Sequence, residues 1–216
     1  MEIKPQTVRI SMVLNSVFFP LTAREAFDSF QKRQFVMGQP KPALPTGPRV
    51  YVSGTIAMKG NVLVGVENQK NLVGVQGDSI EECLTVFEEV IGILKEDFNI
   101  SLKEDMNYAE LIVQYLIPTK SNAFEALQKS VAFKSNQKLN EILDADTSIY
   151  SYSIVPKGVL PSSKKWFEIT ISPKLTMPTK AYWLEIVFRD INTQAVTAFT
   201  ADLNSTICKI MDVIEK

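Results

Sequence analysis

The residues of this sequence that can do acid–base chemistry are carboxylates and lysines, because the chain contains no histidine. Histidine is the commonest general base and the commonest metal ligand in proteins. Its absence excludes Ser-His and Cys-His pairs and histidine zinc sites. Glu81, Glu82, Glu88 and Glu89 are closely spaced carboxylates, but on a helix they fall opposite an apolar stripe, which indicates a solvated face. We therefore expect no catalytic residues, cofactor or metal, and an enzyme working through carboxylates or lysine is the least favoured alternative.

Lysines are the one local charge bias of the chain. Between residues 155 and 181, Glu168 is the only acid, and the basic residues there are Lys157, Lys164, Lys165, Lys174 and Lys180. Four prolines in this stretch place most of these lysines on loops. They are candidates for contacting phosphates or an acidic protein, and solvated loop lysines are the ordinary interpretation. Tyr51, Trp166 and Trp183 are candidate partner-binding aromatics, against ordinary strand aromatics as the alternative.

Composition and charge favour a packed protein without a strong overall field. The chain has 216 residues, of which 45% are apolar, and 23 basic residues nearly balance 24 acidic ones. Neither nucleic acid nor an acidic membrane surface is indicated by net charge. The first residues lack a signal-peptide pattern, and no apolar run approaches the length of a membrane span. Two cysteines are too few for a disulfide framework. We expect a cytoplasmic protein without a membrane partner.

Alternating and helical patterns predict mixed elements along the chain. Strands are predicted at 7–14, 49–58, 62–67, 72–76, 109–117, 148–155, 165–172, 182–189 and 194–200. The segment 49–58 would place Val50, Val52, Ile56 and Met58 on one face. Helices are predicted to begin at the capping residues Thr22, Ser79 and Asn122, within 134–147, and from Asn204 to the C-terminus. Residues 37–48 hold four prolines and are predicted to form a loop.

The order strand, helix, strands, long helix occurs twice, which predicts an internal duplication. The repeats would be 1–100 and 108–216, joined by a connector at 101–107. Cys83 lies four residues after Ser79, and Cys208 four after Asn204. Both cysteines are expected to be small core residues on buried helix faces. The predicted fold is α+β, with two tandem repeats forming a curved antiparallel sheet that carries its helices on one face.

The stretch from Asn61 to Leu94 has a strand, a short turn, a strand ending in Gly77, and then a long helix with an acidic cap. In this order of elements the chain resembles the TATA-box-binding protein fold. That resemblance implies two repeats in a saddle with helices on the convex back. The family binds DNA with its concave sheet and opens the minor groove with inserted phenylalanine pairs.

The sequence departs from that family at the DNA-binding positions. No phenylalanine occurs near Val64–Val66, and Phe188 is predicted to point into the core. Alternation instead assigns Trp166, Glu168, Thr170, Ser172 and Glu185 to the exposed side of the sheet. Carboxylates on such a face repel phosphates. We therefore expect the fold without classical TATA-box recognition.

Three functional hypotheses follow from these patterns. The leading one is a non-enzymatic binding or scaffold protein that contacts a macromolecule, protein or nucleic acid, through its open sheet face and lysine-bearing loops. The alternative is a small-molecule-binding protein with an apolar pocket between sheet and helices, where Gly54, Gly65 and Gly74 permit bending or close ligand approach. The third is an enzyme that works through carboxylates or lysine. The open face is equally suited to a second copy of the chain, which would make a homo-oligomer.

Overall fold

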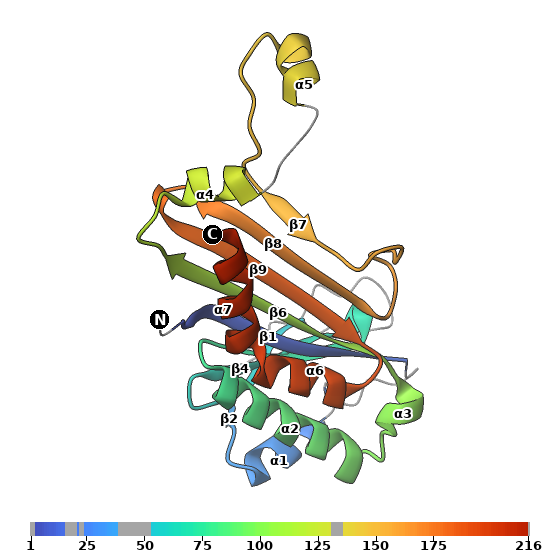
Figure 1. Ribbon diagram of the computed structural model, residues 1–216. Helices are drawn as coiled ribbons and strands as arrows, with labels where there is room; N and C mark the ends of the chain where they lie inside the picture. The colour runs from blue at the N-terminus through green and yellow to red at the C-terminus, as the bar shows by residue number, and fades with distance from the viewer. Residues whose placement is uncertain (1–2, 16–20, 22–23, 39–52, 131–135, 216) are drawn as a thin grey trace.

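The computed structural model describes residues 3–15, 21, 24–38, 53–130 and 136–215 (Figure 1). The described strands are β1 (Pro5–Leu14), β2 (Val36–Met37), β3 (Ser53–Lys59), β4 (Val62–Glu67), β5 (Leu72–Gly77), β6 (Met106–Pro118), β7 (Tyr152–Ile154), β8 (Trp166–Lys174) and β9 (Met177–Asp190). The described helices are α1 (Arg24–Lys32), α2 (Ile80–Glu96), α3 (Leu102–Asp105), α4 (Ala123–Ser130), α5 (Asn136–Leu143), α6 (Thr193–Ala201) and α7 (Leu203–Ile214), with a 3₁₀ turn, η2, at Asn68–Lys70.

All the described strands belong to one antiparallel sheet of order β2-β3-β4-β5-β1-β6-β9-β8-β7. β1 and β6 are neighbours near its middle, where Ile10 pairs with Leu111. The remaining strands up to residue 77 lie beyond β1, and those after residue 118 lie beyond β6. The prediction of an α+β protein built on a large antiparallel sheet is therefore confirmed.

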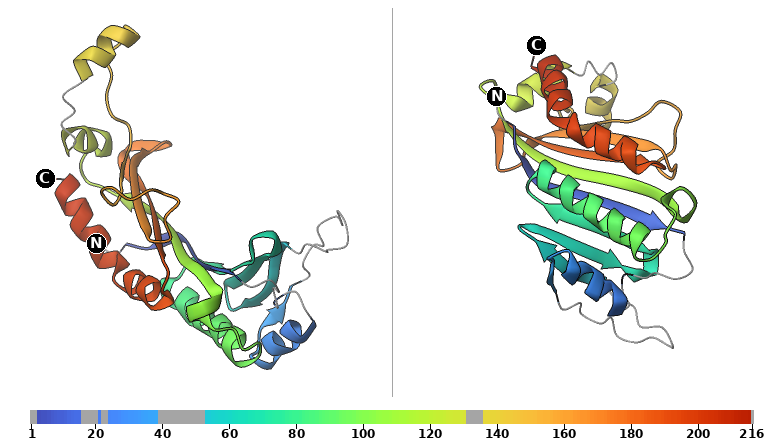
Figure 2. Two further views of the ribbon diagram at one scale, coloured as in Figure 1. Left: turned by 90° about the vertical axis from the view of Figure 1, so that its right-hand side faces the viewer. Right: turned by 90° about the horizontal axis from the view of Figure 1, so that it is seen from below.

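The helices and the sheet form two layers. Figure 2 shows α2, α6 and α7 lying along one side of the sheet, which bends so that its other side is concave and open. The helix α5 stands away from the sheet at one end of the molecule (Figure 1). Among the described helices, none is both long enough and apolar enough to cross a membrane. The expected connector at 101–107 contains α3 and the first residues of β6.

The core lies between the helices and the alternating inward positions of the strands. Val8, Val113 and Ile186 follow one another across β1, β6 and β9, and all three are fully buried. Phe87 of α2 and Ile207 of α7 are fully buried in the same cluster. Alternation places these strand side chains on one face of the sheet, which explains why the opposite face is left to solvent.

The helix α2 begins where the sequence predicts. The Ser79 side chain accepts a hydrogen bond from the backbone N–H of Glu82 at 3.3 Å, which satisfies one of the free donors of the first turn. The apolar stripe faces the sheet, as expected. One acidic residue departs from the predicted solvated face, because Glu89 forms an ion pair with Lys59 of β3 at 2.6 Å. The ammonium of Lys59 also lies 5.1 Å from the centre of the Phe35 ring.

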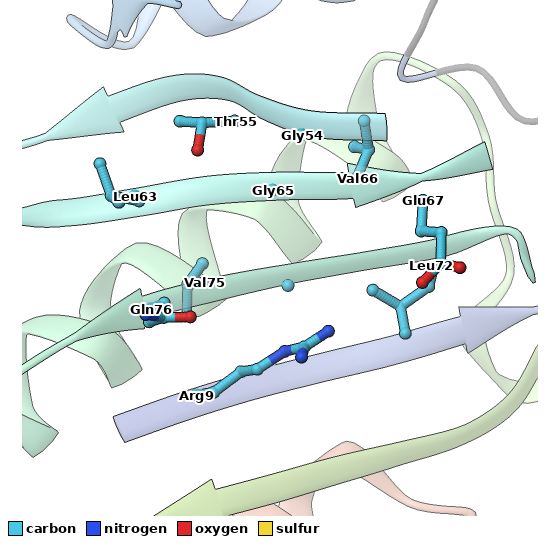
Figure 3. A pocket seen from close by; sticks show the side chains of 11 residues that line it. Arg9, Gly54, Thr55, Leu63, Gly65, Val66, Glu67, Leu72, Val75 and Gln76 are labelled. Atoms are coloured by element: carbon cyan, nitrogen blue, oxygen red, sulfur yellow. The ribbon is translucent and has the colours of Figure 1, made fainter. Parts of the chain in front are cut away.

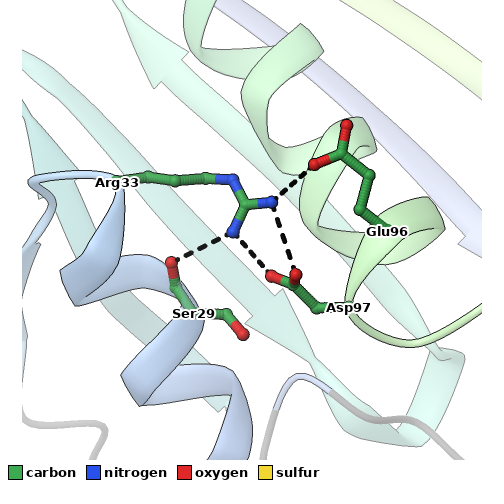
Figure 4. Close-up of polar contacts among 4 residues, drawn as sticks. All are labelled: Ser29, Arg33, Glu96 and Asp97. Atoms are coloured by element: carbon green, nitrogen blue, oxygen red, sulfur yellow. Dashed lines mark hydrogen bonds and ion pairs between the residues drawn. The ribbon is translucent and has the colours of Figure 1, made fainter.

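An arginine ties α1 to the end of α2 (Figure 4). The Arg33 guanidinium donates to Asp97 at 2.6 Å, to Glu96 at 2.8 Å and to the backbone carbonyl of Ser29 at 3.4 Å. The hydrogen bond from Arg33 lowers the pKa of the Asp97 carboxyl, while the same bond raises the pKa of Arg33. Arg33 and Asp97 are 64 residues apart in the sequence, and their contact joins the C-terminal ends of α1 and α2.

The strand predicted at 194–200 is wrong, because this segment forms the helix α6. The Asn192 side chain accepts a hydrogen bond from the Gln194 N–H at 2.9 Å and thereby caps the helix. The next helix, α7, already begins at Leu203, so Asn204 lies inside it and does not cap it. The Asn204 amide oxygen instead accepts a hydrogen bond from the Tyr115 hydroxyl at 3.0 Å.

Two other strand predictions need correction. In β3, the pairing with β4 shifts between Thr55 and Ala57, and this irregularity turns Ile56 inward but leaves Met58 38% exposed. The two residues therefore do not share a face, and Val50 and Val52 lie outside the described residues. The strand predicted at 148–155 is short, with only Tyr152–Ile154 paired. The Thr22 cap and most of the loop at 37–48 also lie outside the described residues.

The other predicted caps and elements agree with the structure. The Asn122 side-chain oxygen accepts from the Glu125 N–H at 3.4 Å and so caps the helix, while the Glu125 carboxylate accepts from the Asn122 side-chain amide at 2.8 Å and not from its backbone N–H as in a full capping box. The helix α5 falls within 134–147. Phe188 packs inward, stacked on Phe199 of α6 with ring centres 4.1 Å apart.

Candidate binding face on the open side of the sheet

The side of the sheet away from α2, α6 and α7 is called the open face here. Its residues are Thr7, Arg9, Ser11 and Val13 of β1; Leu63, Gly65 and Glu67 of β4; Leu72, Gly74 and Gln76 of β5; Tyr108, Glu110, Ile112 and Gln114 of β6; Trp166, Glu168, Thr170 and Ser172 of β8; and Trp183, Glu185, Val187 and Arg189 of β9. These positions alternate with the core positions of the same strands. The open face is therefore a mixed polar and apolar surface.

One row of residues crosses the open face from β3 to β8. The strand register places side by side Thr55, Gly65, Gly74, Ser11, Glu110, Arg189 and Trp166. The row changes character at β1. Toward β4 it consists of glycines, which carry no side chain, and toward β8 it consists of charged and aromatic side chains.

The charged part of this row is an ion pair between neighbouring strands. The Arg189 Nε donates to the Glu110 carboxylate at 2.8 Å. The guanidinium carbon of Arg189 also lies 4.6 Å from the centre of the Tyr108 ring. Only 19% of the Arg189 side chain and 16% of the Glu110 side chain are exposed. Because the pair is half-buried and hydrogen-bonded, it is a structural contact that is unavailable to a ligand.

Arg189 also holds the loop that precedes β8. Its Nη1 donates to the backbone carbonyls of Pro161 at 3.0 Å and Ser163 at 3.3 Å. The next residue in the row, Trp166, is only 7% exposed. The prediction that Trp166 is exposed is therefore wrong, although alternation places it on the correct side of the sheet.

Two carboxylates on this half of the open face lack an ion-pair partner among the described residues. Glu185 accepts a hydrogen bond from the Gln114 amide at 2.6 Å, and Glu168 accepts one from the Thr170 hydroxyl at 3.4 Å. Both glutamates are half-buried. Neutral donors leave the negative charge in place, so this half of the face carries a local acidic surplus.

The lysines of the second half are spread over the molecule. The ammonium of Lys174 lies over the Trp183 ring at 3.9 Å from its centre, which is a cation–π contact at the open face. Lys165 pairs with Asp190 at 3.5 Å. These two lysines occupy opposite ends of β8, about 30 Å apart at strand geometry. They do not form one basic patch.

The remaining predicted site residues divide into three positions. Lys157 and Lys164 are exposed on the loop before β8, as expected. Lys180 is exposed within β9, and Lys174 lies within β8, so these two are exceptions to the prediction that most of the five lysines lie on loops. Tyr51 lies outside the described residues.

The first half of the open face contains a hollow of about 250 Å³ (Figure 3). Its floor is formed at Gly65 and Gly74, which are paired across β4 and β5. Gly65 is half-buried, and Gly74 is buried next to Ser11 of β1. Leu63 and Leu72 stand at its rim (Figure 3). A volume of this size is below the range of typical pockets for drug-sized ligands, which begins at about 300 Å³. The hollow is large enough for about one side chain.

One cation reaches into this hollow. Arg9 of β1 lines the hollow, and its guanidinium is directed toward Leu72 of β5 (Figure 3). Within the part of the chain that the structure describes, Arg9 makes no ion pair. Glu67, at the far rim, is already paired with Lys70 at 2.9 Å. The hollow therefore combines an apolar rim, a bare floor and one uncompensated positive charge.

A second depression lies on the helix side of the molecule. This groove of about 1110 Å³ opens where α2, α3 and α6 meet the start of β6. Ile91 and Met106 give it apolar walls, and Glu88 and Lys95 contribute charges. The small-molecule alternative expects an apolar pocket between sheet and helices, but that layer is filled by buried side chains such as Phe87. This groove is therefore not the expected pocket.

The sequence matches no known protein-family model, and no curated protein is significantly similar to it. Among the described residues, no three cysteine or acidic side chains are grouped so that they could hold a metal ion. Sequence reasoning missed the Glu110–Arg189 pair and the role of Arg9 in the hollow. The alternation of strand residues could have placed Arg9, Glu110 and Arg189 on the open face. It could not show which residues they contact, because those contacts depend on strand register.

Proposed function

We propose that the chain is a non-enzymatic binding or scaffold protein, and that its open face contacts a protein partner. The observation that carries this proposal is the acidic surplus at Glu168 and Glu185 on the concave side of the sheet. Half-buried carboxylates repel the phosphates of nucleic acid, since nucleic-acid surfaces rely on lysine and arginine. A protein partner can supply both donors for these carboxylates and apolar contacts.

Exposed apolar groups on the same face support this choice. Met58 and Leu63 are paired across β3 and β4, and each is 38% exposed. Trp183 is half-buried under Lys174, and aromatic residues are enriched at protein interfaces. Mixed polar and apolar character is typical of a protein-binding surface.

The finer arrangement of the fold is part of the proposal. The two halves are tandem repeats arranged as in TATA-box-binding proteins, with β1 and β6 as equivalent central strands. Support comes from the sheet order, in which β5-β4-β3 follow outward from β1 as β9-β8-β7 follow outward from β6. The long helix α2 follows the first set, and the consecutive helices α6 and α7 follow the second.

Position-specific crosslinking tests the proposed face. A photoreactive amino acid at Ser172 on the open face is expected to capture a protein of defined mass, whereas one at Lys209, exposed on α7, captures none. The matched charge reversals are Glu185→Lys on the open face and Glu88→Lys on α2. Only the first should abolish capture. Capture from Lys209 alone, or salt-sensitive binding of DNA or RNA to the unmodified chain, would contradict the proposal.

The mass of the captured species also separates a foreign partner from a second copy. A product at twice the mass of the chain would assign the open face to self-association. A product of any other mass would identify a different protein, which can then be purified and tested for direct binding.

A further inference from the structure

The hollow on the first half of the open face contains a positive charge, that of Arg9, which has no ion-pair partner among the described residues. Arg9 is half-buried and lines the hollow together with Gly74, with its guanidinium directed toward Leu72 (Figure 3). No carboxylate among the described residues lies within ion-pairing distance of it. Arginine binds carboxylates with paired, charge-assisted hydrogen bonds. The preferred occupant of the hollow therefore carries a carboxylate.

The surroundings of this guanidinium define the rest of the occupant. Leu63 and Leu72 form an apolar rim beside the glycine floor. A Cβ at position 65 would have only the Gly54 carbonyl oxygen near it, at 3.8 Å, so the space above this glycine is open. With a volume of about 250 Å³, the hollow holds a side chain more readily than a free cofactor.

We infer that the hollow is a subsite for an acidic side chain, Asp or Glu, next to an apolar residue in a peptide segment of the protein partner. The carboxylate would bind the Arg9 guanidinium, and the neighbouring apolar side chain would pack against Leu63 and Leu72. This inference rests on the proposed function, because it assigns part of the partner to one half of the open face. The positive charge of Arg9 favours an acidic segment of the partner here. On the other half of the open face, the carboxylates of Glu168 and Glu185 favour hydrogen-bond donors from the partner.

A titration with two matched peptides tests the subsite without the partner. The probes are acetyl-Leu-Glu-Leu-amide and acetyl-Leu-Gln-Leu-amide, added to the ¹⁵N-labelled full chain and followed by NMR. The glutamate peptide should shift the amide signals of Gly65 and Gly74 and the side-chain N–H of Arg9. The glutamine peptide should bind about tenfold more weakly, because it cannot form the charged hydrogen bonds.

Two variants locate the effect. Arg9→Gln should reduce binding of the glutamate peptide to that of the glutamine peptide. Gly65→Val should weaken both, because its side chain occupies the hollow and its Cβ meets nothing closer than the Gly54 carbonyl oxygen at 3.8 Å. Lys174→Gln, at the other end of the open face, is the control and should change neither. Equal affinity for both peptides, no shift at the glycines, or unchanged binding by Arg9→Gln would overturn the inference, as would tighter binding of inorganic phosphate.

Failure of the subsite and failure of the proposed function give different experimental results. If crosslinking at Ser172 finds a partner whose affinity is indifferent to Arg9→Gln, the subsite is wrong and the function stands. If no partner is captured but the glutamate peptide binds as described, the function is wrong and the chemistry of the hollow stands.

Discussion

Arg189 and Glu110 form an ion pair across β6 and β9, and the same guanidinium holds two carbonyls of the loop before β8. One side chain thus joins two adjacent strands and fixes the segment that leads into Trp166. Since the pair lies on the open face but is mostly buried, its main effect is on the shape of that face. Its charge is not available to a partner.

Replacing Arg189 should therefore release the loop and expose Trp166. Arg189→Met removes the hydrogen bonds to Pro161 and Ser163 and leaves the Glu110 carboxylate unpaired, at an expected cost of about 2 kcal/mol of unfolding free energy. In a Trp183→Phe background, the fluorescence of Trp166 should shift to longer wavelength. Urea denaturation measures the stability change.

The control for this prediction is Lys165→Met, which breaks the ion pair with Asp190 at the same end of the sheet. Lys165 is 66% exposed, and Asp190 keeps a hydrogen bond from the Asn192 N–H at 2.9 Å, so the loss should be at most about 1 kcal/mol. An Arg189→Met protein with an unchanged Trp166 emission maximum would contradict the role assigned to the arginine.

The two glycines of the hollow should respond differently to alanine. A Cβ at position 74 would lie 2.8 Å from the Ser11 Cβ and 2.9 Å from the Ile10 carbonyl oxygen, so Gly74→Ala must move β1 or β5. We expect it to lower the unfolding free energy by about 1–3 kcal/mol. Gly65→Ala meets nothing closer than 3.8 Å and should be neutral or stabilising by up to about 1 kcal/mol. Equal effects in urea denaturation would refute the close approach at Gly74.

The contact between Arg33 and Asp97 should make part of the stability depend on pH. The hydrogen bond from Arg33 lowers the pKa of Asp97 in the folded chain below its ordinary value of 3.8. A carboxyl with a lowered folded pKa contributes stability above its unfolded pKa and loses that stability as the pH falls through the folded pKa. The contribution should therefore be complete at pH 6 and decline below about pH 4.

A double-mutant cycle with Arg33→Met and Asp97→Asn isolates this contribution from other acid effects. The Asp97 side chain is 30% exposed, so a coupling of at most about 1 kcal/mol is expected at pH 6. Urea denaturation at pH 6 and pH 3 measures it. A coupling that is as large at pH 3 as at pH 6 would show that the carboxylate is not its source.

The sequence correctly predicts those parts of the fold that depend on interactions between residues close together in the chain. The alternation of Val8, Ile10 and Met12 gives the inward face of β1, and Ser79 marks the start of α2, because period and capping need no knowledge of distant segments. The strand predicted at 194–200 is wrong because it rests on the same short-range patterns alone. Its β-branched residues favour a strand, and the helix depends on the cap at Asn192.

The open face is harder to predict because its properties arise between distant segments. Alternation assigns Trp166 to the correct side, yet its burial depends on Arg189 holding a loop 26 residues away in sequence. Arg9 is similar. Register sets it between Gln76 and Ile112, two neighbours without charge, and only the assembled sheet shows that its guanidinium lacks a partner among the described residues.

The two cysteines should differ in reactivity, although the sequence gives them matching positions. Cys83 is fully buried on the inner face of α2, and burial raises the pKa of its thiol to about 12, so almost no thiolate forms at pH 8. Cys208 of α7 is partly exposed. A disulfide exchange reagent at pH 8 should therefore label one thiol rapidly and the second only after denaturation. In the Cys208→Ala variant the rapid phase should vanish, whereas its persistence would show that Cys83 is accessible in the folded chain.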